Sequence, residues 1–236
     1  MPVFKALDDA FGLTRAIIST YQSVSGAGKE GMDELMATTR ALLRQLGDID
    51  PAQAVGASSE IPENRVFARP IAFNLVAQID QFINGDASNP SEQIYAGYTK
   101  EETKVIHESR KILHRPNLKV TATAVRVPVM VGHSESVTLE FEKPVTPQAA
   151  MAILRATPNI ILAEAPQDFP SPVEVTGKDP VYVGRVRQDT SNPEHGLNLW
   201  IVADNLRIGA ALNAVRIAES LVTQGLLCKA GKACPL

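Results

Sequence analysis

The chain has 236 residues, of which 44% are hydrophobic and 21% charged, and its formal net charge is −3. This length and composition predict a globular protein of one large domain or two small ones. The acidic balance argues against a dedicated nucleic-acid binder, and no apolar run approaches the roughly 18 residues that cross a bilayer. The first residues carry no secretory signal pattern, so we expect a cytoplasmic protein with neither nucleic-acid nor membrane partners.

Cysteine and histidine usage argues against two common kinds of site. Both cysteines, Cys228 and Cys234, lie in the C-terminal tail, and the four histidines are not closely paired. We therefore expect neither a disulfide framework nor a zinc site, and we expect the protein to bind no metal ion.

The N-terminal part alternates helical and extended patterns. Residues 2–12 predict a short amphipathic helix that ends at a glycine, and residues 15–24, rich in β-branched side chains, predict a buried strand. A tight turn at residues 25–28 leads into a predicted helix over residues 29–46. Apolar side chains at helical spacing predict one core-facing stripe on this helix: Met32, Leu35, Met36, Leu42, Leu43 and Leu46.

A long irregular stretch follows. Residues 47–70 contain several glycines and prolines and predict an excursion whose length suggests a functional or interface loop. Residues 71–79 predict a strand, and residues 84–98 predict a second loop.

The next pattern is a helix followed by strands. Thr99 and Glu102 have the spacing of a capping box, which predicts a helix from here to about Leu113. Residues 120–131 and 136–141 alternate and are β-branched, which predicts long antiparallel strands.

The C-terminal part predicts a helix over residues 147–157 and strands over residues 181–187 and 197–202. Asp204 or Asn205 can cap the final helix, which is rich in small residues that would let a neighbour approach closely.

Together these elements predict an α+β, or mixed α/β, fold with a broad, largely antiparallel sheet and helices packed on it. We expect one domain over residues 1–222 and a tail over residues 223–236.

A glycine motif follows the first predicted strand, because residues 26–31 read G-x-G-x-x-G. A dinucleotide-binding unit would need a second strand ending in an acidic residue about 20 positions on. Asp48 and Asp50 fall near that distance, but no apolar strand precedes them. The motif also fails as a P-loop, because Ser23 stands where the first glycine belongs and Glu30 follows the lysine. What remains is a helix N-terminus that suits a negative or carbonyl group.

Two further features permit two interpretations each. Gln22 at the strand end either satisfies the backbone of the turn or points its amide at a substrate. Glu101, Lys104, Glu108 and Lys111 form a charged stripe on one helix, and a solvated face with mutual ion pairs is the simpler interpretation.

Arg126 and His133 are the most informative pair. An arginine within an apolar strand is costly unless an anion meets its guanidinium group, although a structural carboxylate is the commoner partner. Seven residues separate the two, so an unbroken strand would place them on opposite faces. Pro128 and Gly132 lie between them and could mark a bend that restores a common face.

Six stretches, in order along almost the whole chain, resemble the aspartate-β-semialdehyde dehydrogenases. They are residues 19–28 (STYQSVSGAG), 99–113, 126–136 (RVPVMVGHSES), 182–185 (YVGR), 196–200 (GLNLW) and 204–207 (DNLR). The resemblance implies the C-terminal substrate-binding and dimerisation part of such an enzyme, with a fold like the C-terminal domain of glyceraldehyde-3-phosphate dehydrogenase.

The resemblance implies a reaction in which L-β-aspartyl phosphate is reduced with NADPH to aspartate semialdehyde and phosphate. This reaction feeds the lysine, threonine, methionine and diaminopimelate pathways. It also implies that Arg126 holds the substrate α-carboxylate and that His133 is the acid–base partner of a cysteine nucleophile. Gln22 would orient the acyl group, Glu101 would meet the substrate amino group and Lys104 the phosphate.

For the cofactor, the resemblance implies that Ser25, Gly26 and Asn205 lie near the nicotinamide of NADP, which is bound mainly by another domain. The partners would be the small-molecule substrate and a second copy of the chain in a homodimer.

The family's nucleophile lies in an Asn-Cys-Ser/Thr turn that this sequence does not contain, so we expect the chain alone to be inactive. A non-catalytic dimerisation or interaction module, and an N-acetylglutamyl-phosphate reductase, remain as alternatives.

Overall fold

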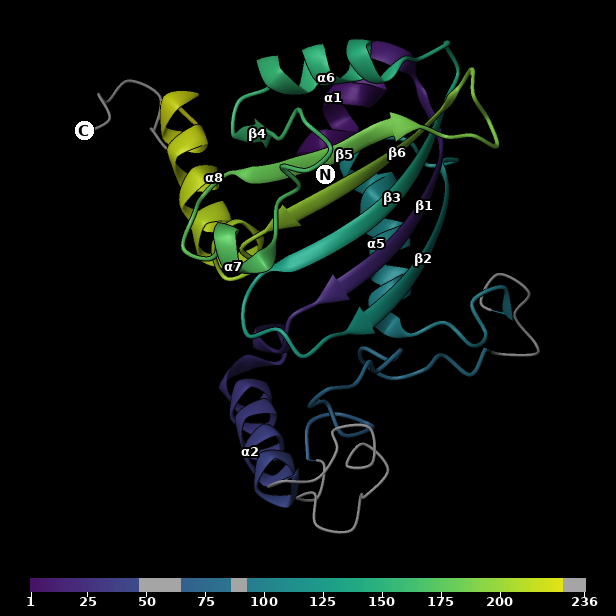
Figure 1. The fold of residues 1–236 in the computed structure, drawn as a ribbon. Coiled ribbons are helices and arrows are strands. Elements are labelled where there is room, and N and C mark those ends of the chain that lie inside the picture. Colours follow the sequence, from purple (N-terminus) through teal and green to yellow (C-terminus); the bar gives the residue numbers. More distant parts are fainter. Residues whose placement is uncertain (47–64, 86–92, 227–236) are drawn as a thin grey trace.

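A six-stranded mixed sheet organises the chain. This computed structural model describes residues 1–46, 65–85 and 93–226. The sheet order is β2-β1-β3-β6-β5-β4, with β1–β2 and β4–β5 parallel and the other neighbours antiparallel (Figure 1). The strands are β1 (Leu13–Gln22), β2 (Lys119–Arg126), β3 (His133–Phe141), β4 (Ile160–Leu162), β5 (Val181–Gln188) and β6 (Gly196–Ala203). The predicted mixed fold with a largely antiparallel sheet is confirmed.

The helices lie on one face of this sheet or project from its ends. They are α1 (Pro2–Phe11), α2 (Gly28–Leu46), α5 (Lys100–Ile112), α6 (Pro147–Ala156), α7 (Pro172–Val175) and α8 (Leu212–Thr223), with a 3-10 turn at Val24–Ala27 and a π-helical turn at Arg207–Ala211. The main core forms where α1 and α6 pack on the sheet. There α1 buries Val3, Phe4 and Leu7, and it stops at Gly12, whose φ of 73° is in the left-handed region that favours glycine.

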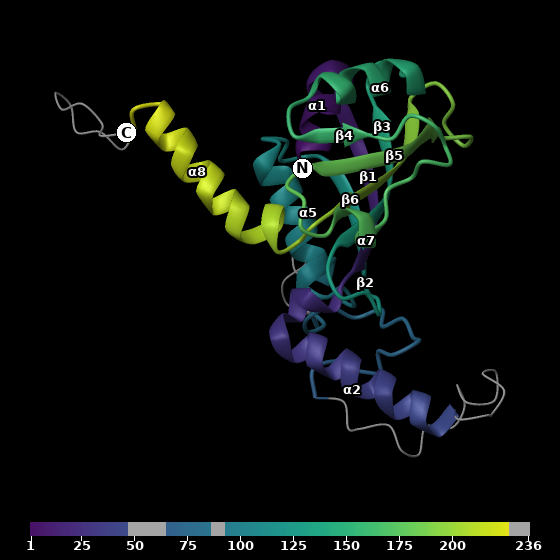
Figure 2. The same ribbon diagram turned by 60° about the vertical axis from the view of Figure 1, so that its left-hand side comes forward.

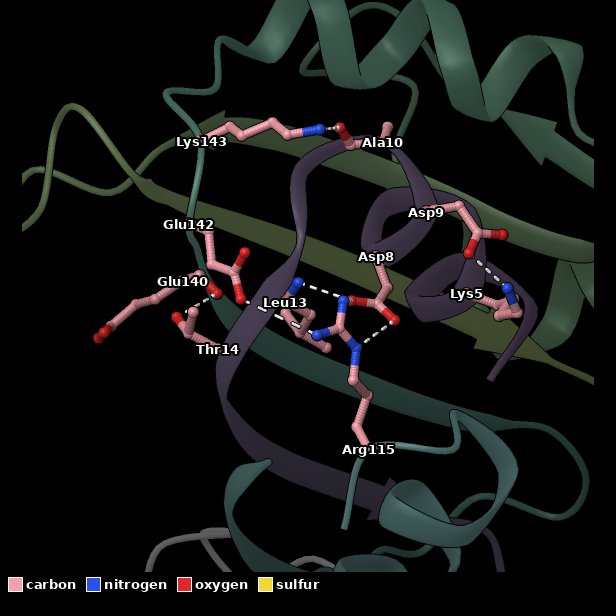
Figure 3. A network of polar contacts seen from close by, with 10 residues as sticks. All are labelled: Lys5, Asp8, Asp9, Ala10, Leu13, Thr14, Arg115, Glu140, Glu142 and Lys143. Carbon is pink, nitrogen blue, oxygen red and sulfur yellow. Dashed lines mark hydrogen bonds and ion pairs between the residues drawn. The ribbon is translucent and has the colours of Figure 1, made fainter. Parts of the chain in front are cut away.

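A buried carboxylate fastens α1 to the beginning of β1, and Figure 3 shows its contacts. Asp8 accepts hydrogen bonds from the backbone N–H of Leu13 at 2.7 Å and from the guanidinium group of Arg115 at 2.9 and 3.2 Å. Arg115 follows α5 in the chain, so this single side chain joins the helix, the strand and the α5–β2 connection.

The predicted strand over residues 71–79 is wrong. Within it only Val76 makes an isolated antiparallel bridge, to Arg126 on the sheet edge. The backbone turns at both ends of the segment, where Phe73 and Asp80 have φ values of 55° and 67° that an extended strand excludes.

The strand predicted over residues 120–131 ends early, at Arg126, because Pro128 cannot donate a backbone hydrogen bond and Gly132 turns the chain with a φ of 97°. Strand β2 pairs in parallel with β1, whereas β3 pairs antiparallel with β1 and β6, so the predicted antiparallel pairing is confirmed for the second segment and wrong for the first. The two strands flank β1.

The glycine motif does not open a doubly wound unit. Helix α2 extends away from the sheet below the strand ends and does not return across it (Figure 1). Leu35 and Leu42 of the predicted stripe are buried in a small second core with Phe67 and Ile71. Met36 and Leu43 are exposed, so that part of the stripe is wrong: the helix packs on one narrow side only.

The C-terminal helix stands apart from the body (Figures 1 and 2). Asp204 caps the turn before it by accepting from the backbone N–H groups of Leu206 and Arg207. None of its residues is buried, and its small side chains are exposed. Residues 47–64, within the predicted irregular loop, and residues 227–236, which include both cysteines, lie outside the described residues. The division at residue 222 therefore stays a prediction.

Candidate functional site

The ends of two strands and the start of a third lie side by side at one end of the sheet. Gln22 ends β1 and pairs in parallel register with Arg126, which ends β2. Strand β3 runs antiparallel to β1 and begins at His133, one residue before the partner of Tyr21. Arg126 and His133 thus flank the same strand end from either side, and the break between β2 and β3 brings them together.

Arg126 is a buried arginine that pairs with no carboxylate among the described residues. Its side chain is 5% exposed, its Nη1 donates to the carbonyl oxygen of Ser23 at 2.7 Å, and its guanidinium group lies 5.9 Å from the ring centre of Phe67. Among the described residues no carboxylate lies within ion-pair distance, although Arg126 borders a cavity of about 310 Å³. Burial lowers the pKa of Arg126, and the charge of Glu101 opposes this. A buried cation in this state can hold an anion.

His133 lies beside it and faces the turn after β1. Its Nδ1 is 3.2 Å from the backbone nitrogen of Ser23 and 3.1 Å from the Ser23 hydroxyl. Burial and, to a smaller extent, the positive charge of Arg126 together lower the pKa of His133 to about 4. The ring is therefore neutral at pH 7.

Gln22 connects this pair to helix α5. Its side-chain nitrogen donates to Glu101 at 3.2 Å, and Glu101 lies 3.6 Å from the ammonium group of Lys104. The Gln22 amide therefore donates its hydrogen bond to helix α5 and not to the backbone of the turn. Lys104 remains 59% exposed, so its charge faces solvent at the rim.

Ser25, Gly26 and Asn205 complete the cluster. The side-chain oxygen of Asn205 accepts from the backbone N–H of Gly132 at 2.9 Å and from the hydroxyls of Ser23 and Ser25 at 3.1 and 3.2 Å. Gly26 has an ordinary φ, but a methyl group there would lie 2.7 Å from Arg126 Nη1 and 3.3 Å from the His133 ring. Because Gly26 has no side chain, the space beside Arg126 and His133 stays open.

All the predicted site residues thus lie in one connected group: Gln22, Ser25, Gly26, Glu101, Lys104, Arg126, His133 and Asn205. We call the central four, Gln22, Glu101, Arg126 and His133, the strand-end cluster.

The sequence analysis missed two residues that organise this cluster. Ser23 contacts both Arg126 and His133 through its backbone, and its position next to Gln22 gave no signal from residue type. Glu102, predicted only as a capping residue, is buried and accepts from the backbone N–H groups of Thr99 at 2.8 Å and Ala124 at 2.9 Å. It thereby ties the helix that carries Glu101 to the strand that carries Arg126.

Over the described ranges, no group of three or more His, Cys, Asp and Glu side chains could hold a metal ion. In the same part of the chain no helix is long and apolar enough to span a membrane.

Comparison with known proteins places this cluster in a family. The sequence pattern described as "Semialdehyde dehydrogenase, dimerisation domain" matches residues 4–208. The chain belongs to that family. Aspartate-semialdehyde dehydrogenase of Aquifex aeolicus is 42% identical over 225 residues, which are 94% of this chain but 59% of that relative. The chain therefore spans less than two thirds of the length of the relatives it matches.

Solved structures agree on the fold. Aspartate semialdehyde dehydrogenase II of Vibrio cholerae, in complex with ASA, matches with a TM-score of 0.80 and 44% identity over 94% of this chain and 58% of that one. The enzyme of Candida albicans with NADP has a TM-score of 0.63 at 22% identity, covering 95% of this chain and 55% of that one. The latter likeness shows the fold alone.

Proposed function

We propose that this chain is the substrate-binding and dimerisation part of an NADP-dependent aspartate-semialdehyde dehydrogenase in the cytoplasm. The enzyme would reduce L-β-aspartyl phosphate to L-aspartate 4-semialdehyde and release phosphate. The observation that carries this proposal is the buried Arg126, which has no carboxylate partner among the described residues and lies beside His133 and the Gln22–Glu101 pair.

Each charge of such a substrate has a complementary group in the cluster. The guanidinium of Arg126 would hold the α-carboxylate, and desolvation strengthens that charge-assisted contact. Glu101 would meet the amino group, and Lys104, 3.6 Å from it and largely exposed, would meet the phosphate. Gln22 donates one amide hydrogen to Glu101, so its other amide hydrogen and its amide oxygen are available to orient the acyl group.

His133 would accept and return the proton at the reacting oxygen. Its lowered pKa keeps the ring neutral at pH 7, so the ring would act first as a base. The thiol nucleophile would come from outside this sequence, whose only cysteines are Cys228 and Cys234.

The residues of this chain fit only one end of NADP. Gly26 is exposed. Within the described residues Asn205 donates one of its two amide hydrogens to Ser25, which leaves the other available. Gly26 and Asn205 could therefore both contact the carboxamide of the nicotinamide. NADPH, when bound, supplies the hydride that reduces the acyl group. The rest of the cofactor would be held mainly by residues that this chain does not contain.

A homodimer would form through the sheet face that carries no helices. Over β1, β2 and β3 this face is open in Figure 1, and several of its side chains are half-buried and uncharged, among them Ile17, Ser19, Tyr21 and Ser136. Such a face is typical of a protein surface that a partner covers.

The test is a chimeric enzyme in which this chain replaces the matching part of the Vibrio cholerae relative. We expect it to oxidise aspartate semialdehyde with NADP only when phosphate is present, while the isolated chain shows no turnover. A chimera that folds and dimerises but stays inactive would favour a non-catalytic interaction module. Preference for N-acetylglutamate semialdehyde would identify a different acyl-phosphate reductase.

A further inference from the structure

A buried carboxylate at the start of helix α5 fastens that helix to strand β2. Glu102 is 7% exposed. Its Oε2 accepts from the backbone N–H of Thr99 at 2.8 Å, and its Oε1 accepts from the backbone N–H of Ala124 at 2.9 Å. A capping box explains only the first of these contacts, because Thr99 is the N-cap of the same helix. The contact with Ala124 joins two separate elements of the fold.

The two elements that Glu102 joins carry opposite charges of the strand-end cluster. Glu101 precedes Glu102 on the helix, and Arg126 lies two residues after Ala124 on the strand. No ion pair joins Glu101 to Arg126 within the described residues, although the charge of Glu101 raises the pKa of Arg126. The two groups are therefore near each other without a direct contact, and the position of α5 on β2 determines the space between them.

A second polar contact fastens α5 at the end far from the cluster. Arg110 Nε donates to the carbonyl oxygen of Leu118 at 2.9 Å, immediately before β2 begins. Loss of this contact would loosen the helix away from the cluster. Loss of the contact between Glu102 and Ala124 would instead let Glu101 move relative to Arg126. The two contacts therefore differ in what they position.

We infer that Glu102 is a positioning residue that sets the separation of Glu101 from Arg126, and that this separation selects a substrate with an amino group beside its carboxylate. The inference rests on the proposed function, in which Arg126 holds the carboxylate and Glu101 the amino group. Both groups of an α-amino acid are attached to one carbon, so covalent geometry fixes their spacing. The protein must hold a matching spacing, because charge-assisted hydrogen bonds depend on distance and direction.

A carboxylate suits this role and an amide does not. Each oxygen of Glu102 meets a different backbone N–H, whereas glutamine offers one oxygen and an NH2 group that would face an N–H donor. Glu102→Gln therefore loses one of the two contacts with almost no change in size. Glu102→Asp keeps both oxygens but shortens the side chain by one carbon, so it tests the same contact with the charge retained if Glu102→Gln does not fold.

The experiment compares two aldehydes in the chimeric enzyme: aspartate semialdehyde, and succinate semialdehyde, which lacks only the amino group. The measured quantity is the ratio of the two kcat/KM values. We expect Glu102→Gln and Glu102→Asp each to lower the preference for the amino-bearing aldehyde about 10-fold, because a hydrogen bond to a charged group is weakened. A merely structural role would lower both kcat/KM values together and leave their ratio unchanged.

Arg110→Ala is the matched control, because it removes the contact of α5 at the far end. We expect this variant to have a lower melting temperature and an unchanged ratio. Glu101→Gln should lower the ratio at least as much as the Glu102 variants do.

The outcomes separate the inference from the proposed function. A ratio lowered in Glu101→Gln but unchanged in the Glu102 variants would overturn the inference and leave the proposed function intact. An equal fall of the ratio in Arg110→Ala would overturn it too, because helix stability and not Glu102 would then set the preference. A chimera that does not oxidise aspartate semialdehyde would contradict the proposed function and, with it, this inference.

Discussion

At the scale of single residues, the site depends on the absence of a side chain at Gly26. Gly26 has no conformational need for glycine, yet an added methyl group would lie 2.7 Å from Arg126 Nη1. If Arg126 moved away from such a group, it would lose the 2.7 Å contact of Nη1 with the Ser23 carbonyl oxygen. Space at this position therefore determines where the guanidinium points.

Gly26→Ala should weaken binding of the substrate carboxylate, with a KM for aspartate semialdehyde in the chimera raised about 10-fold, since a hydrogen bond to a charged group is worth about 1.5–3 kcal/mol. Gly209→Ala is the control, because a methyl group there meets open space in the described part of the chain. Equal KM values for the two variants would show that the hollow over Gly26 does not matter.

His133 should also make stability depend on pH. Its pKa is about 4 in the folded chain against 6.5 in the unfolded chain, so below pH 6.5 the unfolded state takes up a proton more readily. Stability is therefore unaffected above that value and is lost as the pH falls, by about 2 kcal/mol at pH 5.

The measurement is urea unfolding at pH 7.5 and pH 5. His133→Gln should lose less stability over this interval than the unsubstituted chain, whereas the exposed His107→Gln should lose the same amount. A pH dependence that survives unchanged in His133→Gln would contradict the assigned burial.

At the scale of elements, α1 is held in place by a polar contact as well as by its apolar face. Asp8 is buried and contacts Leu13 and Arg115, while its neighbour Asp9 is exposed and pairs with Lys5 (Figure 3). Asp8→Ala should lower the free energy of unfolding by about 2 kcal/mol, because it leaves a buried N–H and an arginine without their acceptor. Asp9→Ala should cost less than about 0.5 kcal/mol. Similar losses in denaturant unfolding would show that the network in Figure 3 does not hold the helix.

The elements also show where sequence reasoning works. Helix α5 was predictable because Thr99 and Glu102 form a capping box that depends only on neighbouring residues, and the structure contains both of its hydrogen bonds. The segment at residues 71–79 was wrongly predicted as a strand because it is apolar, as strand β2 is, and only pairing partners far away in sequence distinguish the two. The residues that carry charge were predictable by type, but Ser23 contributes its backbone, which is the same in every residue.

At the scale of the whole molecule, one face of the sheet is left without helices, and this predicts assembly. Ser19 lies on that face in the central part of the sheet, between Thr123 of β2 and Ser136 of β3. Ser19→Arg should place two like charges in a dimer interface and produce a monomer without loss of secondary structure, because an unpaired charge is costly to bury.

Sedimentation velocity measures this directly, with Thr190→Arg on the exposed β5–β6 turn as the control. We expect a dimer for the control and for the unsubstituted chain. A monomeric unsubstituted chain, or a Ser19→Arg variant that remains dimeric, would contradict an interface on this face.

Arg126 is the residue proposed to hold the carboxylate of aspartate semialdehyde. The measurement that tests this role most directly is the KM for aspartate semialdehyde of the chimera carrying Arg126→Lys, beside the exposed Arg155→Lys as control. Lysine keeps the charge and loses the bidentate geometry, so we predict a KM raised about 10-fold to 100-fold with a smaller change in kcat. A KM unchanged by Arg126→Lys would contradict the assignment and leave the buried guanidinium as a structural group.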